Sequence, residues 1–237
     1  CEMAEEKIAE RIDANLLNVN IRDIAELPEV LYKSKVTEIS RKTQGKLIIK
    51  EYPTASAHAG HFKALLSDLS LKKGFKPDII FIDYLNICAS ARYKGAIVNS
   101  YTYVKAIAEE LRGLAVEHNL PIVSATQTTR SGFGSSDPDL TDTSESFGLP
   151  ATADLMFALI STEELEQQGR LMVKQLKNRY NDPTSSRKFM VGIDRSKMRL
   201  YDVAEDANVI NVEEDEDTNP QFTETKNRLS KFAEWNV

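Results

Sequence analysis

The chain has 237 residues, of which 41% are hydrophobic and 28% are charged, as in globular proteins that live in water. No apolar run reaches the roughly 18 residues that a transmembrane helix needs, and two cysteines are too few for a disulfide scaffold or a zinc cluster. We therefore expect no membrane partner and a reducing, cytoplasmic compartment. The net charge is −6 and is unevenly distributed along the chain.

Residues 204–237 hold nine acids and three bases, so they carry the whole net charge, while residues 1–203 hold 27 of each. Five consecutive acids, 213–217, are typical of disordered segments. We predict a folded domain over 1–203 and a disordered acidic tail over 204–237. The neutral domain neither favours nor excludes nucleic-acid binding, since a few local bases can bind a strand.

Helical and extended patterns alternate along the first half of the chain. Residue 1 is Cys rather than Met and a helical pattern begins almost at once, so we expect a piece of a longer protein. Apolar spacing predicts helices over 4–17, from Pro28 to about Gly45, and from about Gly60 to Gly74. Apolar residues within 46–52 predict a short strand, and the apolar run at 78–84 predicts a central strand buried on both faces.

The second half continues the alternation and then becomes rich in strands. Asn99 or Ser100 can cap a long helix that runs to Glu117, with its apolar residues on one face. The expected strands are 120–125, 154–160, 171–176, 187–193 and 198–203, the last two forming a hairpin. The order of elements predicts an α/β fold: a mostly parallel twisted sheet flanked by helices, with antiparallel strands at one edge.

Polar side chains follow several of these strands. Asp83 closes a buried strand, the position of the Walker-B acid that holds Mg²⁺ in P-loop ATPases, although an Asp can also cap the next element. Gln127 follows the next strand and could touch a γ-phosphate or an attacking water, or be simply solvated. Lys177 and Arg179 point the same way from a strand end, as in a basic finger or an ordinary basic loop.

The phosphate-binding loop GxxxxGK[ST] of P-loop ATPases does not occur in these 237 residues. Two explanations are open. The chain is not an NTPase, or the loop belongs to sequence upstream of Cys1. The order of the remaining motifs favours the second explanation.

Together these motifs resemble the RecA-like motor domain of DnaB-family replicative helicases, in the form found in T4-type bacteriophages. The resemblance covers about residues 1–203. The segments that carry it are Glu2-Met3, Ile82-Asp83-Tyr84-Leu85, Ala125-Thr126-Gln127-Thr128-Thr129-Arg130, the stretch from Ser144-Glu145-Ser146 to Ala153-Asp154, and Lys177-Asn178-Arg179. The phage-type segments are Asn99-Ser100-Tyr101-Thr102, 104–112 and 148–154.

The resemblance implies a role for each matching residue. Glu2 corresponds to the catalytic acid that activates the hydrolytic water, and Asp83 to the acid that binds Mg²⁺ beside ATP. Gln127 corresponds to the γ-phosphate sensor. Arg179 corresponds to an arginine finger, with Lys177 as its companion, acting on the ATP of the next subunit in a homo-hexameric ring.

The resemblance also implies that loops after Tyr84 and Gln127 line a channel for single-stranded DNA. In many relatives an Arg precedes the Glu-Ser pair of the DNA loop, whereas Ser144 stands there in this chain. The expected DNA contacts are Arg92, Lys94, Arg130, Glu145 and Ser146.

We therefore expect part of an ATP-dependent replicative helicase that moves on single-stranded DNA and unwinds duplex in the cytoplasm of a host cell. A primase and a helicase loader are the expected partners. Two alternatives stay open: a RecA-like recombinase ATPase, and a non-catalytic piece that binds DNA or partners and acts only with its missing half.

Overall fold

The computed structural model describes residues 3–93, 98–128, 140, 148–182 and 187–203, all within the unit Cys1–Val203. The second unit, Ala204–Val237, lies outside the described residues, and so does the predicted acidic tail. None of the described helices is both long enough and apolar enough to cross a bilayer.

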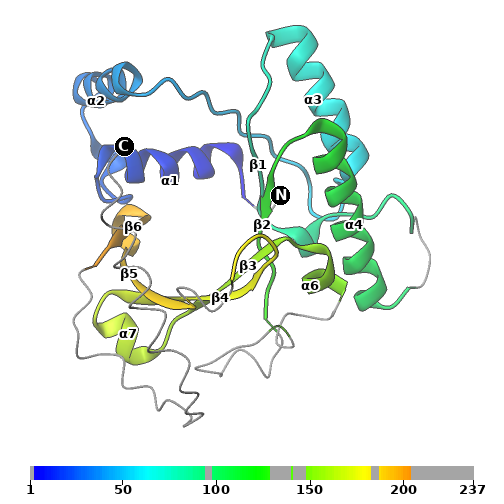
Figure 1. Ribbon diagram of the computed structural model, residues 1–237. Helices are drawn as coiled ribbons and strands as arrows, with labels where there is room; N and C mark the ends of the chain where they lie inside the picture. The colour runs from blue at the N-terminus through cyan, green and yellow to red at the C-terminus, as the bar shows by residue number, and fades with distance from the viewer. Residues whose placement is uncertain (1–2, 94–97, 129–139, 141–147, 183–186, 204–237) are drawn as a thin grey trace, which may run out of the picture. The chain divides into compact units, whose positions relative to one another are not determined.

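The first two helices pack on each other (Figure 1). They are α1 (Glu5–Leu17) and α2 (Glu29–Lys42), joined through the short 3-10 helix η1 (Ile24–Glu26). Helix α1 ends at Asn18, whose left-handed backbone (φ 56°) returns its N–H to carbonyls of the last turn. The Tyr32 hydroxyl donates a hydrogen bond of 2.7 Å to the Asp13 carboxylate, which ties α2 to α1.

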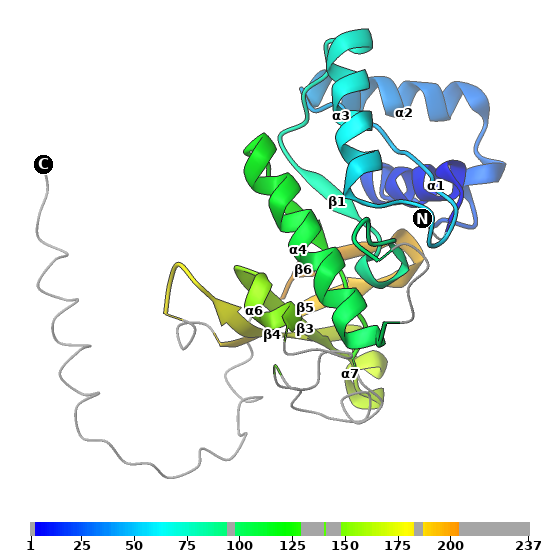
Figure 2. The same ribbon diagram turned by 90° about the vertical axis from the view of Figure 1, so that its right-hand side faces the viewer.

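Helices α3 (Ala59–Lys73) and α4 (Ser100–His118) lie side by side (Figures 1 and 2). The Asn99 side chain caps α4 by accepting a hydrogen bond of 2.7 Å from the Thr102 N–H, as the sequence predicts. Helix α3 ends at Gly74 in the left-handed region (φ 60°). The expected bounds of both helices are confirmed.

The hydrophobic core is built on one face of α4. Its buried residues face the strand β1 (Ile80–Ile82) and the helix α3. Ile107 is among the largest fully buried side chains of the described residues. The apolar stripe predicted from the sequence is buried in full, at Val104, Ile107, Ala108, Leu111 and Leu114.

The strands form two separate sheets. β1 pairs in parallel with β2 (Ile122–Ser124), with Phe81 opposite Val123. Four further strands form an antiparallel sheet in sequence order: β3 (Leu155–Ile160), β4 (Arg170–Asn178), β5 (Lys188–Asp194) and β6 (Arg199–Asp202). The short helices α6 (Gly148–Thr152) and α7 (Glu163–Gln167), and the 3-10 turns η2 (Leu85–Ile87) and η4 (Arg195–Lys197), connect these elements.

The α/β class and the β5–β6 hairpin are confirmed, but the balance of the sheets differs from the expectation. The described strands make one parallel pair and three antiparallel pairs, so the sheet is not mostly parallel. Nor is β1 buried on both faces, because α4 covers one face while Phe81 on the other is 69% exposed.

The strand expected within 46–52 is wrong. These residues form no helix and no strand of the described structure, and Leu47 is 63% exposed. A strand needs a neighbouring backbone to pair with, whereas the Glu51 N–H donates instead to the Glu5 carboxylate at 2.8 Å. That contact lowers the pKa of Glu5, helped by Lys50.

We predict that Ile107→Ala lowers the free energy of unfolding by about 2–5 kcal/mol, because it leaves a cavity under α4. The matched control is Val116→Ala on the same helix, which is exposed and should change stability by less than about 0.5 kcal/mol. Urea denaturation of the three chains measures both values. Equal effects of the two substitutions would contradict the assignment of the core.

Candidate functional site

Asp83 and Gln127 come from the carboxyl ends of the two parallel strands. Asp83 directly follows β1, and Gln127 lies three residues beyond β2. The carboxyl ends of parallel strands meet at one edge, where α/β proteins bind ligands. The Asp83–Tyr84 peptide bond is cis. Because β1 and β2 are parallel, Asp83 and Gln127 follow the same edge of this strand pair.

Hydrogen bonds join the loops that carry these two residues. Gln127 Nε2 donates to the Tyr84 hydroxyl oxygen at 3.3 Å, and Thr126 Oγ1 donates to Asn86 Oδ1 at 2.8 Å. The Leu85 N–H donates to a carbonyl after β2 at 3.1 Å. The loop that begins at Asp83 and the loop that holds Gln127 are therefore connected by hydrogen bonds.

The donor set at this edge fits part of a magnesium–nucleotide site. The described residues contain no group of three His, Cys, Asp or Glu side chains that could enclose a metal ion. Mg²⁺ often uses only one or two carboxylates and takes its other ligands from water and phosphate oxygens, which suits the exposed Asp83. The phosphate-loop pattern that accompanies such a carboxylate in P-loop ATPases does not occur in these 237 residues.

Lys177 and Arg179 lie at the end of β4, beside a carboxylate that the sequence reasoning did not use. Arg179 Nη1 is 2.8 Å from Asp154 Oδ1, and the Arg179 N–H donates to the Asp154 carbonyl at 2.9 Å. Arg112 of α4 donates to Asp154 Oδ2 at 2.8 Å and to the Thr152 carbonyl at 2.8 Å. Two arginines thus share one carboxylate.

This cluster shifts the pKa values of its members in the directions that its charges require. The hydrogen bond from Arg112, with the charges of Arg112, Arg179 and Lys177, lowers the pKa of Asp154. Partial burial, followed by the charge of Arg179, lowers the pKa of Lys177. The Lys177 ammonium donates to the Pro150 carbonyl. The cluster holds three cations around one carboxylate and therefore suits a further anion.

Arg112 and Asp154 were missed because their partnership spans 42 residues and joins a helix to the start of a strand. Both residues stand inside segments that carry the family resemblance, 104–112 and 148–154, but neither received a role. A pairing at this distance cannot be derived from the spacing of one sequence.

The expected DNA contacts are only partly within the described residues. The Arg92 side chain forms an ion pair with Glu109, which raises the Arg92 pKa, and the N–H groups of Ala91 and Arg92 donate to Glu110. The part of the loop that reaches Arg92 is therefore tied to α4, and DNA binding by Arg92 stays a prediction. Glu2, Lys94, Arg130, Glu145 and Ser146 lie outside the described residues.

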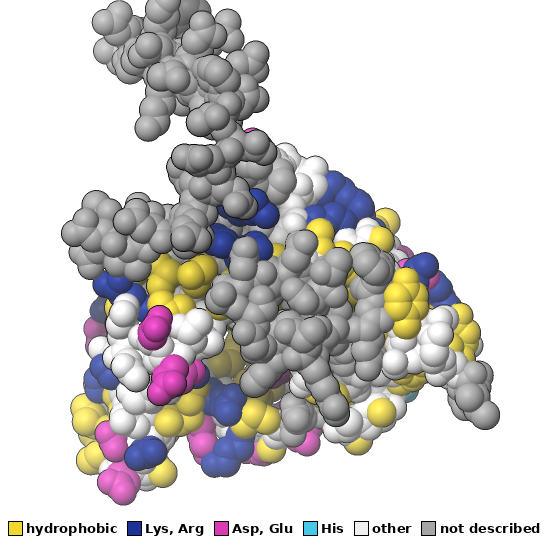
Figure 3. Space-filling model, turned by 90° about the horizontal axis from the view of Figure 1, so that it is seen from below, with side chains coloured by type: hydrophobic (Ala, Val, Ile, Leu, Met, Phe, Trp, Pro, Cys, Tyr) yellow, Lys and Arg dark blue, Asp and Glu magenta, His cyan; other side chains and the backbone are white. Residues whose placement is uncertain are grey.

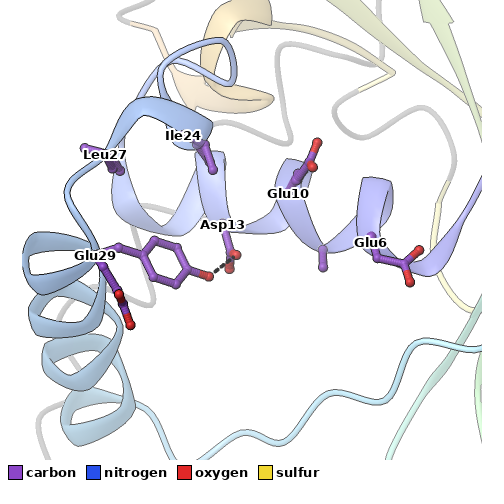
Figure 4. Close-up of a pocket in the computed structure, with 8 residues that line it drawn as sticks. Glu6, Glu10, Asp13, Ile24, Leu27 and Glu29 are labelled. Atoms are coloured by element: carbon purple, nitrogen blue, oxygen red, sulfur yellow. Dashed lines mark hydrogen bonds between the residues drawn. The ribbon is translucent and has the colours of Figure 1, made fainter.

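Two views of the described residues show the character of the surface outside these two clusters. Figure 3 shows a face on which described basic, acidic and hydrophobic side chains are interspersed. A pocket between α1, η1 and α2 is lined by four carboxylates (Figure 4). They belong to Glu6, Glu10, Asp13 and Glu29. Four negative charges disfavour a ligand that carries phosphates.

We predict that acid weakens the native chain more than an Asp154→Asn variant. The lowered pKa of Asp154 means that its stabilising contribution is present above its unfolded pKa and is lost as the pH falls through its folded pKa. Urea denaturation between pH 6 and 2 compares the two chains. In an Arg112→Met background the difference should shrink, and equal acid dependence of the native chain and Asp154→Asn would contradict the ion pair.

Comparisons with known proteins identify the family of this chain. The family model described as the DnaB-like helicase C terminal domain matches residues 1–195. A DnaB-like replicative helicase of Enterobacteria phage T4 is 45% identical over 216 residues, which are 90% of this chain and 46% of that protein. The chain thus spans about half the length of this relative.

Two solved structures share the fold at low sequence identity. One, described as an ATPase domain, has a TM-score of 0.71 at 17% identity, covering 86% of this chain and 72% of that one. A DnaB-like replicative helicase, described with its interactions with primase, has a TM-score of 0.69 at 18% identity, covering 86% and 50%. With the sequence matches, these confirm the expected resemblance: the chain belongs to the family of DnaB-like helicase C-terminal domains.

Proposed function

We propose that this chain is part of the motor of a replicative DNA helicase that uses ATP to move along single-stranded DNA and separate the duplex. The observation that carries the proposal is the presence of two groups of candidate catalytic residues within residues 3–182, each at the end of strands. We call each group a half-site. Asp83 and Gln127 emerge at the carboxyl edge of the parallel strands, while Lys177 and Arg179 stand at the end of an antiparallel strand. Family membership supports a replicative helicase over a recombinase.

Each half-site has a distinct task in this proposal. When bound with ATP, Mg²⁺ would withdraw charge from the phosphates. The Asp83 carboxylate would hold that ion, and the Gln127 amide would donate to a phosphate oxygen. Arg179 and Lys177 neutralise negative charge on the ATP held by the next subunit of a homo-hexamer, where Glu2 orients the attacking water.

A further polypeptide segment has to complete the nucleotide site. A parallel strand pair is normally covered on both faces, yet Phe81 and Val123 are 69% and 46% exposed on the face opposite α4. We infer that a segment with the phosphate loop covers this face. Without it, these 237 residues act as a non-catalytic part that binds DNA or a partner.

The DNA and its partners follow from the same proposal. The loops after Tyr84 and Gln127 carry basic side chains that bind the phosphates of single-stranded DNA. The proposed contacts are Arg92, Lys94, Arg130, Glu145 and Ser146. A primase and a helicase loader are the proposed partners, in the cytoplasm of the host cell. The proposed folded domain is 1–203, with 204–237 as its acidic tail.

We predict that this chain alone does not hydrolyse ATP and that activity appears when the part of the phage T4 relative that this chain does not cover is mixed with it. The measurement is magnesium-dependent ATP hydrolysis with and without single-stranded DNA. Hydrolysis by the chain alone would contradict the assignment of its half-sites. If neither sample hydrolyses ATP but DNA still binds, the chain is a binding module instead.

We predict that Arg179→Ala in the active mixture lowers DNA-stimulated kcat by about 10³-fold or more, the usual effect of removing an arginine finger. ATP binding should stay within about twofold, because the finger acts on the nucleotide of another subunit. The matched control is Arg195→Ala, which removes an exposed arginine paired with Glu166 in the same region of the chain. Native turnover in Arg179→Ala would contradict the role of the finger.

A further inference from the structure

The two arginines on Asp154 are held in different ways. Arg112 Nη1 donates hydrogen bonds of 2.8 Å both to Asp154 Oδ2 and to the Thr152 carbonyl. Arg179 Nη1 is equally near the other oxygen, Oδ1, at 2.8 Å, but Oδ1 is buried and accepts no hydrogen bond within the described part of the chain. The contact of Arg179 is therefore electrostatic without the alignment of a hydrogen bond.

The backbone of Arg179 is fixed while its side chain is loosely held. The Arg179 N–H donates to the Asp154 carbonyl at 2.9 Å, which anchors the residue at the end of β4. Among the described residues, the guanidinium adds one long hydrogen bond, 3.4 Å, from Nη2 to the Ala151 carbonyl, and the side chain is 45% exposed. A side chain in this state can change partners without any change in the sheet.

The cations around Asp154 outnumber this carboxylate, so the cluster favours the binding of a second anion. Arg112, Arg179 and Lys177 surround this one carboxylate, and each acts on its titration. An incoming phosphate oxygen can satisfy Arg179 in place of Oδ1, while Arg112 continues to hold Oδ2. The carboxylate then stays hydrogen-bonded after the exchange, so it is not left as a buried charge without a partner.

We propose that Asp154 is a positioning residue that holds Arg179 ready as an exchangeable counter-ion, with Arg112 locking the carboxylate in place. The proposal rests on the proposed function in one respect, namely that the anion that takes Arg179 from Asp154 is the triphosphate of a neighbouring subunit. Asp154 itself touches no substrate. Its effect is to place the guanidinium before the nucleotide arrives.

The first test uses the 237-residue chain alone and inorganic tripolyphosphate as the probe, with calorimetry at low salt. Asp154→Asn removes the competing charge, so the probe should bind about three- to tenfold more tightly than to the native chain. The gain should vanish in Asp154→Asn with Arg179→Ala. No gain, or a gain that survives the loss of Arg179, would overturn the proposal.

The second test separates positioning from stability in the mixture that hydrolyses ATP. Asp154→Asn and Arg112→Gln should each lower kcat about tenfold with KM unchanged, because Arg179 is present but no longer placed. The matched control is Glu166→Gln, which removes the carboxylate of the Arg195 ion pair and should leave kcat unchanged. If Arg179→Ala is inactive but Asp154→Asn has the native kcat, the positioning role is wrong while the helicase proposal stands.

The two tests fail independently. If the native mixture does not hydrolyse ATP, the proposed function fails, but the tripolyphosphate measurement still decides whether Asp154 competes for Arg179. If tripolyphosphate binding responds to Asp154 and Arg179 as expected, the exchange is supported even without turnover.

Discussion

The burial of one face of α4 is the constraint on which the described structure depends. Its apolar side chains fill the space between α3 and the parallel strands, so the helix cannot rotate without exposing the core. The direction in which each polar residue of α4 leaves the helix is consequently fixed relative to the core. The same helix that stabilises the fold thereby fixes where its charged residues leave the backbone.

Two of those polar positions connect distant parts of the proposed motor. Glu109 and Glu110 hold the loop that follows β1, while Arg112, one turn or less further along, holds Asp154 and through it Arg179. A loop expected near DNA and a finger expected near a neighbour's nucleotide are thus both anchored on a short stretch of a rigid helix.

The two sheets divide the proposed chemistry between them. The parallel pair presents Asp83 and Gln127, and the antiparallel sheet presents Lys177 and Arg179. This division suits the proposed ring, in which the arginine finger of one subunit contacts the nucleotide of the next. In such a ring the two half-sites that act on one nucleotide come from different subunits. The exposed apolar face around Phe81 and Val123 bears on how the nucleotide site is completed. Burial of that surface would favour the docking of the proposed segment that carries the phosphate loop.

The sequence by itself determined the elements whose signals are local. Caps and apolar spacing predicted α1, α3 and α4, turn residues predicted the β5–β6 hairpin, and strand ends predicted Asp83 and Gln127 as candidate site residues. Only the tertiary structure decided what depends on distant partners. Residues 46–52 have the composition of a strand, but a strand exists only where another backbone pairs with it, and Glu5 occupies the Glu51 N–H. The pairing of Arg112, Asp154 and Arg179 likewise arises only when α4, β3 and β4 meet, because charge interactions depend on distance in space and not on separation along the chain.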